Sequence, residues 1–214
     1  MLRIISFDMD GTLVRSSYVE SVWLERMPEL YAERHGLRLE EAKERVYDEY
    51  MSVGTGDLRW YDLGYWLGHF DIKERWESLL DRYLDRIEFY PEVESALEML
   101  SPRYKLVVAS NGAREFVERE LDGIRHYFAA VFSITTDFEK VKSNPLAYHD
   151  LCSHMGARPD EVLHIGDHRF YDYEVPIEAG LKALYLDRNR MEVGRHVVHD
   201  LLEAAEKILE VREH

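Results

Sequence analysis

Residues 3–13 read RIISFDMDGTL, and this stretch decides the fold. Its first half, Arg3–Phe7, is an apolar run of strand length that ends directly at Asp8 and Asp10. Similar runs follow along the chain at Lys105–Ala109, Val131–Ile134, Glu161–Ile165 and Ala183–Leu186. A short apolar run closed by polar turn residues is typical of a buried strand in a parallel sheet.

Helical patterns separate these runs. They cover Glu92–Leu100, Arg114–Leu121, Leu146–Met155 and Tyr173–Ala179, and His199–Val211 adds a final helix with one apolar stripe. Strands that alternate with helices in this way indicate parallel βαβ units. The sequence therefore predicts an α/β fold with a doubly wound, Rossmann-like parallel sheet.

One interval breaks the alternation. Residues 16–86 contain no convincing strand and carry apolar residues at helical spacing, as in Tyr61–Phe70 and Trp76–Leu84. Glycines punctuate Gly54–Trp60, which predicts a loop between helices. We therefore expect an α/β core formed by residues 1–15 and 87–214 and an inserted all-helical cap domain at residues 16–86.

Composition and charge exclude several classes of protein. The 214 residues include 42 acidic and 27 basic side chains, so the net charge of −15 would repel a nucleic-acid backbone. No apolar run approaches ~18 residues, and the start of the chain lacks the apolar core of a signal peptide. The one cysteine, Cys152, suits a reducing compartment. These features predict a cytoplasmic protein that binds neither nucleic acid nor membrane.

In an open parallel sheet, ligands bind beyond the carboxyl ends of the strands. Asp8 and Asp10 follow the first strand, where one carboxylate could attack phosphorus and the other could transfer a proton. The alternative is an Asp-Gly turn that caps a helix, which would explain Asp10 and Gly11 but not Asp8.

The next two strands are also followed by polar residues. Ser110-Asn111-Gly112 opens a turn whose free amides suit a phosphoryl oxygen, although such a sequence is also ordinary loop chemistry. Beyond the third strand, Lys140 or Lys142 could neutralise developing negative charge. Lys142 is preferred because Lys-Ser-Asn-Pro leads directly into a predicted helix.

The fourth strand ends at Gly166-Asp167, and Asp172 follows. Carboxylates that face the first pair describe a Mg²⁺ site, since clustered carboxylates repel one another without a cation. Asp172 could instead be a helix N-cap. His164 lies within the strand and is predicted to be structural.

Together, Phe7-Asp8-Met9-Asp10-Gly11-Thr12-Leu13, Ser110-Asn111, Lys142 and Gly166-Asp167 with Asp172 resemble the four ordered motifs of the haloacid dehalogenase superfamily of phosphatases. The resemblance covers the predicted core, whereas the insert matches only in position, as a cap after the first motif. It implies that Asp8 is the nucleophile and a metal ligand. Asp10 would be the general acid/base with its backbone carbonyl on the metal.

The resemblance implies roles for the remaining motif residues as well. Asp167 would be a metal ligand, and Asp172 a further ligand or a residue behind the ligands. The phosphoryl group would be held by Ser110, Asn111, Gly112, Gly11, Thr12 and Lys142. The family often places proline after the lysine, whereas this chain has Ser143, so Lys140 remains an alternative. The dehalogenase branch lacks the second aspartate and needs no metal, so Asp10 favours phosphoryl transfer.

The resulting hypothesis is a Mg²⁺-dependent hydrolase that removes phosphate from a small phosphorylated metabolite through an aspartyl-phosphate. The alternatives are a phosphomutase acting on a sugar phosphate and a non-catalytic phosphate-binding protein. Asp57, Arg59 and Trp60 in the cap loop are predicted to select the substrate, unless Trp60 only packs within the cap. The oligomeric state is expected to be monomer or homodimer.

Overall fold

The computed structural model describes residues 1–210 of the chain. The chain forms two compact units: Met1–Val14 together with the segment that starts at Phe89, and Arg15–Glu88. These limits lie close to the core and cap boundaries expected from the sequence. The last predicted helical residue, Val211, lies outside the described residues.

The first unit is built on a parallel six-stranded sheet with the order β3-β2-β1-β4-β5-β6. The strands are β1 (Ile4–Phe7), β2 (Lys105–Ser110), β3 (Phe128–Ser133), β4 (Val162–Gly166), β5 (Lys182–Leu186) and β6 (Val197–Val198). Strand β3 begins earlier than predicted and ends before Ile134, which starts a helix. The short strand β6 was not predicted, because two residues carry no periodicity.

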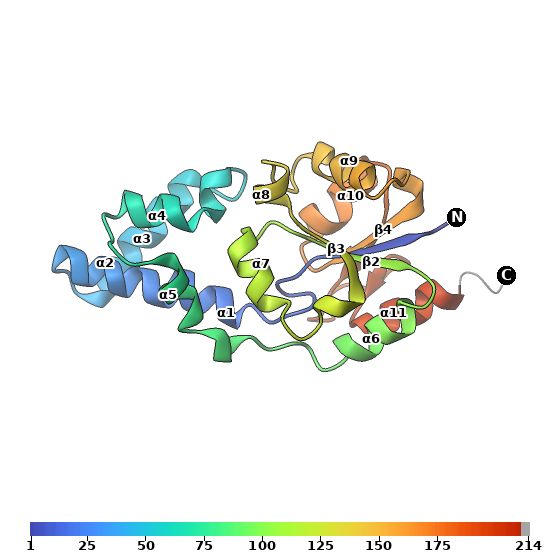
Figure 1. Cartoon of the computed structure of the whole chain (residues 1–214), viewed down its shortest axis with the longest axis horizontal. Helices are drawn as coiled ribbons and strands as arrows, with labels where there is room; N and C mark the ends of the chain where they lie inside the picture. Colours follow the sequence, from blue (N-terminus) through green and yellow to red (C-terminus); the bar gives the residue numbers. More distant parts are fainter. Residues whose placement is uncertain (211–214) are drawn as a thin grey trace. The chain divides into compact units, whose positions relative to one another are not determined.

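Helices cover both faces of this sheet (Figure 1). They are α6 (Val93–Leu100), α7 (Arg114–Glu120), α8 (Ile134–Asp137), α9 (Pro145–His154), α10 (Val175–Glu178) and α11 (Leu201–Glu210). Figure 1 shows α6 and α11 on one side of the sheet and α9 and α10 on the other. The predicted helix Tyr173–Ala179 is a π-helical segment, Arg169–Glu174, that continues into α10.

Strand β1 lies at the centre of the sheet, and all four of its residues are buried. A buried cluster on the α9 side joins Ile4 and Val162 to Leu151 and Cys152. Burial raises the pKa of the Cys152 thiol to about 11, which is typical of an inert core cysteine. Because parallel strands end at a common edge, this buried centre places the ends of β2, β1 and β4 next to one another.

The second unit is helical. It contains α1 (Ser17–Glu20), a π-helical segment (Ser21–Arg26), α2 (Met27–His35), α3 (Leu39–Val53), α4 (Leu63–His69) and α5 (Trp76–Asp81). Single 3₁₀ turns occur at Leu58–Tyr61, inside the predicted loop, and at Leu84–Arg86. Tyr50 is the centre of its packing, with its ring 4.7 Å from that of Trp66 and 5.9 Å from that of Trp23. Within residues 1–210, no helix combines the length and apolar character needed to cross a bilayer.

Candidate active site

The ends of β1, β2 and β4 supply the side chains of the candidate site. Asp8 follows the last residue of β1, Ser110 ends β2, and Asp167 follows the last residue of β4. Because β2, β1 and β4 are neighbours in the sheet, these residues converge at one edge. The predicted meeting of strand ends therefore occurs in the structure.

Lys142 lies at the centre of this edge. Its ammonium is 2.5 Å from Asp8 Oδ1 and 2.7 Å from Asp172 Oδ1, and the residue is only 2% exposed. Although burial lowers its pKa, the charges of Asp172 and Asp8 outweigh that effect and raise the pKa well above its usual value. Lys142 is therefore a fixed cation beside Asp8.

Lys140 lies elsewhere. Its ammonium is 2.9 Å from Asp150 and also donates to the carbonyl of Phe138. The backbone at Lys142 is held in place by Asn111, whose side-chain oxygen accepts a 2.9 Å hydrogen bond from the backbone amide of Lys142. The geometry thus places Lys142, and not Lys140, at the acidic residues.

Three carboxylates of the site could hold a metal ion. Oxygen atoms of Asp8, Asp167 and Asp172 all lie within 4.8 Å of one another. Burial and the charge of Asp8 raise the pKa of Asp167 to about 7, and burial and Asp172 raise that of Asp8. One lysine does not neutralise three carboxylates, so the hard oxygen donors and the raised pKa values of Asp8 and Asp167 fit a divalent cation such as Mg²⁺.

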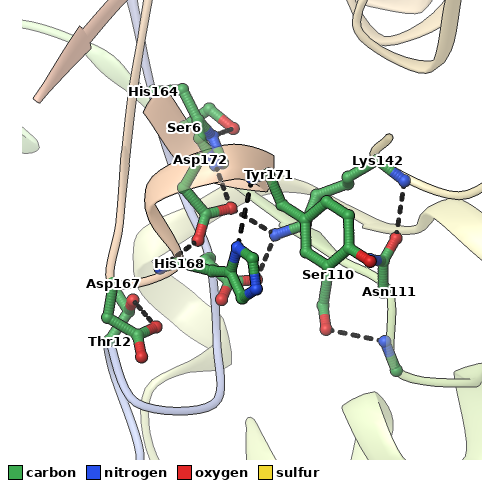
Figure 2. Close-up of polar contacts among 12 residues, drawn as sticks. Ser6, Thr12, Ser110, Asn111, Lys142, His164, Asp167, His168, Tyr171 and Asp172 are labelled. Atoms are coloured by element: carbon green, nitrogen blue, oxygen red, sulfur yellow. Dashed lines mark hydrogen bonds and ion pairs between the residues drawn. The ribbon is translucent and has the colours of Figure 1, made fainter. Parts of the chain in front are cut away.

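Asp172 is already held by several hydrogen bonds (Figure 2). Asp172 is fully buried; its Oδ1 accepts from Lys142 and its Oδ2 from the His168 amide at 2.9 Å. Although burial raises the pKa of Asp172, Lys142 and His164 together hold it below its usual range. Asp172 is thus better placed to anchor Lys142 than to ligate a metal. It is not a helix N-cap either, because His168 occupies that position.

His164 extends this network into the core. One ring nitrogen lies 3.1 Å from Asp172 Oδ1 and the other 2.9 Å from the hydroxyl of Ser6 (Figure 2). Burial lowers the pKa of His164, against the effect of its hydrogen bond with Asp172. A structural role was predicted; the structure adds that His164 supports the carboxylate that holds Lys142. Its position in the strand, two residues before the Gly166-Asp167 pair, gave no sign of this support.

The loop after β1 is closed by its own hydrogen bonds. The amides of Gly11 and Thr12 donate to the carbonyls of Val14 and Met9, and the Thr12 hydroxyl donates to Asp167 Oδ1 at 3.1 Å. These groups already have partners within the loop, and their role in holding a phosphoryl group stays a prediction. Gly11 has a φ of +77°, and a Cβ there would overlap the Asp167 carboxylate. Gly11 thus leaves room for the Asp167 carboxylate, and Thr12 holds that carboxylate with a hydrogen bond.

The turn after β2 keeps its predicted donors near the site. Ser110 is 2% exposed, and its hydroxyl oxygen accepts from the Gly112 amide at 2.9 Å (Figure 2). A hydroxyl that accepts one hydrogen bond can still donate its own proton, here to a phosphoryl oxygen. The Gly112 amide is the donor of that hydrogen bond, and the side-chain oxygen of Asn111 accepts from the backbone amide of Lys142.

Asp10 lies outside the metal-binding group and beside Glu120, a fully buried residue of α7. Burial and the charge of Asp8 raise the pKa of Asp10 to about 7, and burial and Asp10 raise that of Glu120 well above its usual value. A carboxyl group with its pKa raised toward neutrality suits a group that both gives and takes a proton. These contacts concern the Asp10 side chain, so they do not test the prediction that the Asp10 backbone carbonyl binds the metal. Glu120 was not anticipated, because a glutamate in an amphipathic helix predicts exposure.

The predicted substrate-selecting residues lie in the helical unit. Asp57 accepts from the backbone amide of Arg59 at 2.9 Å and from its guanidinium at 2.7 Å. The Trp60 ring is half-buried, 6.1 Å from that of Tyr50, and its carbonyl accepts from the Trp66 indole at 3.3 Å. The two charges therefore neutralise each other, and Trp60 packs on the unit's aromatic centre.

Comparison with known proteins identifies the family. Residues 2–180 match the family model described as haloacid dehalogenase-like hydrolase. A phosphoglycolate phosphatase of Aquifex aeolicus is 29% identical over 85% of this chain and 81% of its own length. The GMP/IMP nucleotidase YrfG of Escherichia coli is 26% identical over 76% of this chain and 73% of its own length.

Solved structures give the same result. A HAD phosphatase from Thermococcus onnurineus superposes with a TM-score of 0.86 at 25% identity, covering 98% of both chains. A 2-haloacid dehalogenase from Pseudomonas syringae shares the fold, with a TM-score of 0.66, 20% identity and coverage of 99% and 100%. The family model covers most of the chain, and the fold agrees with it. The protein therefore belongs to the haloacid dehalogenase-like hydrolases.

Proposed function

We propose that this hydrolase is a Mg²⁺-dependent phosphatase that cleaves a small-molecule phosphomonoester through an aspartyl-phosphate at Asp8. The observation that carries the proposal is the pairing of Asp8 with two different groups. Lys142 lies 2.5 Å away as a buried cation, and Asp10, with a pKa of about 7, is its neighbour in the same loop. A nucleophile, a fixed positive charge and a proton carrier are what phosphoryl transfer to a carboxylate requires.

The family includes both phosphatases and dehalogenases, and Asp10 favours the phosphatase. A halide leaves without a proton, whereas an alkoxide needs one. A buried carboxyl group with a pKa of about 7 can supply that proton at neutral pH. The phosphatase and nucleotidase relatives support the same choice.

In the first step, an oxygen of Asp8 attacks phosphorus and the bond from phosphorus to the ester oxygen breaks. Protonated Asp10 gives its proton to the departing alkoxide, and Lys142 stabilises the charge around Asp8. The Ser110 hydroxyl donates to a phosphoryl oxygen.

In the second step, Asp10 is ionised and accepts a proton from the attacking water. The bond from phosphorus to Asp8 breaks, and inorganic phosphate leaves. Asp8 and Asp167 would hold Mg²⁺, which supplies positive charge to the phosphoryl oxygens when bound.

The test is phosphate release from sugar phosphates, phosphoglycolate, nucleotides and an aryl phosphate, with Mg²⁺ and with a chelator. We expect release that depends on the metal and is lost in Asp8→Asn. Turnover without phosphate release, with transfer between positions of a sugar bisphosphate, would identify a phosphomutase instead. Phosphate binding without turnover in either assay would leave only a binding protein.

A further inference from the structure

Arg188 follows β5 and reaches the loop that carries Asp8 and Asp10. Its Nε donates to the carbonyl of Gly11 at 2.8 Å, and its Nη2 donates to the carbonyl of Thr12 at 2.6 Å. The side chain is only 16% exposed. Hydrogen bonds from a charged donor are stronger than those between neutral groups. Both of these bonds are formed by a largely buried guanidinium.

The other side of the same guanidinium is also occupied. Its Nη1 donates to Glu92 at 2.8 Å, and its carbon lies 3.4 Å from the centre of the Tyr90 ring. Arginine can satisfy all these partners at once because its donors form a planar fork that also stacks on aromatic rings. Arg188 therefore links the β1 loop to the segment before α6.

Those two segments are the places where the chain leaves the core and returns to it. The core ends at Val14 and resumes at Phe89, and these two residues form an antiparallel bridge. Next to the bridge, the Tyr90 amide donates to the carbonyl of Leu13 at 3.2 Å. Arg188 thus connects the segment where the chain leaves the core to the segment where it returns, and it does so without contacting the carboxylates of the site.

The inner side of the loop is held by a different residue. The Thr12 hydroxyl donates to Asp167, and Gly11 lies directly against the same carboxylate. Asp10, the residue before Gly11, is therefore attached to a loop that is fixed from both sides. Without Arg188 two loop carbonyls would lose their donors, and the peptide groups next to Asp10 could rotate.

We propose that Arg188 is a positioning residue, which fixes the Asp8–Thr12 loop and thereby the direction of Asp10, by clamping two loop carbonyls to Tyr90 and Glu92. Its effect on turnover rests on the proposed phosphatase function. Its effect on the loop does not.

The experiment compares Arg188→Ala and Arg188→Lys with Arg158→Ala, a matched control whose exposed arginine pairs with the neighbouring Asp160 and Glu161. Hydrogen–deuterium exchange would be followed in the peptide that covers residues 8–14. We expect exchange there to rise roughly tenfold or more in Arg188→Ala, as the loss of charged hydrogen bonds predicts. The melting temperature is recorded for every variant to identify general destabilisation.

The catalytic readout separates positioning from simple stabilisation. In Arg188→Ala, kcat should fall roughly 100-fold while KM stays within about threefold. Guanidinium ion added to the solution should restore part of kcat in Arg188→Ala and have no such effect on Arg158→Ala. Arg188→Lys should recover little, because one ammonium cannot replace the planar fork.

Each outcome decides the proposal. Unchanged exchange in residues 8–14 would overturn it, and so would a loosened loop with an unchanged kcat. If the wild-type protein releases phosphate from no ester, the proposed function fails, and the exchange experiment alone decides whether Arg188 fixes the loop.

Discussion

The core site and the cap loop both combine aspartates with a basic side chain, but the balance of charge differs between them. In the core, burial raises the pKa of Asp167 to about 7, and Lys142 pairs with only two of the three clustered carboxylates, Asp8 and Asp172. In the cap loop, the hydrogen bond from Arg59 lowers the pKa of exposed Asp57 to about 2. In the cap loop, Arg59 neutralises the charge of Asp57. The core site keeps negative charge that its one lysine does not neutralise. We infer that the chemistry belongs to the core.

The largest expected effect is that of removing the nucleophile. Asp8→Asn should reduce kcat by about 10⁶-fold, because it removes the carboxylate that forms the proposed covalent intermediate. The measurement is metal-dependent phosphate release. Asp150→Asn, which removes a partly exposed partner of Lys140, is the control and should retain activity. Substantial turnover in Asp8→Asn would exclude Asp8 as the nucleophile.

The two lysines offer a matched comparison of a buried and an exposed ion pair. Lys142→Met should lower kcat by about 10³-fold. It should also lower the free energy of unfolding by about 3–5 kcal/mol, because it leaves Asp8 and Asp172 buried without their cation.

Lys140→Met should cost at most about 1 kcal/mol, since its pair with Asp150 is partly exposed. Urea unfolding and steady-state kinetics of both variants provide the data. Equal effects of the two substitutions would show that burial does not set the importance of these lysines.

The uncompensated charge of the core should make metal stabilisation depend on pH. Without metal, the pKa values of Asp10 and Asp167 are about 7 in the folded state, against about 3.9 in the unfolded state. The folded state therefore holds more protons between these values, and the free energy of unfolding falls as pH rises from about 4 to about 7. His164, whose folded pKa is lowered, opposes this trend up to about pH 6.5.

Mg²⁺ requires the ionised carboxylates, so the rise in melting temperature that it causes should be larger at about pH 8 than at about pH 5.5. Thermal unfolding with and without Mg²⁺ at both pH values tests this. Asp167→Asn should abolish most of the difference. An equal shift at the two pH values would mean that these carboxylates do not bind the ion.

The smallest effect is expected in the cap loop. Trp60→Ala should change the ratio of kcat/KM between two substrates by roughly tenfold, if the ring borders the substrate. Melting temperature should fall modestly, because the half-buried ring packs near Tyr50. An equal loss of kcat/KM on all substrates would show that Trp60 acts through this packing alone.

The sequence alone predicted the parts of the site that follow from strand ends. Asp8, Ser110 and Asp167 were identifiable because parallel strands bring their carboxyl ends together, and the run into Pro145 favoured Lys142 over Lys140. Substrate selection by the cap loop remains a prediction.

Partners from distant parts of the chain could not be predicted. Glu120, His164 and Arg188 contact the site from a helix, a strand interior and the segment after β5, and no local pattern marks them. Gly11 and Thr12 were predicted to hold the phosphoryl group, and no pattern in the sequence indicated how their own loop hydrogen-bonds. The loop closes on itself through the carbonyls of Met9 and Val14.

The most direct test of the central claim is to stop the reaction with acid during turnover and to locate the phosphoryl group by mass spectrometry of the peptide around Asp8. We predict one phosphoryl group on Asp8 in the wild-type protein, more of it when Asp10→Asn slows hydrolysis of the intermediate, and none in Asp8→Asn. A phosphoryl group on another residue, or continuing turnover in which no protein-bound phosphate forms, would contradict the account.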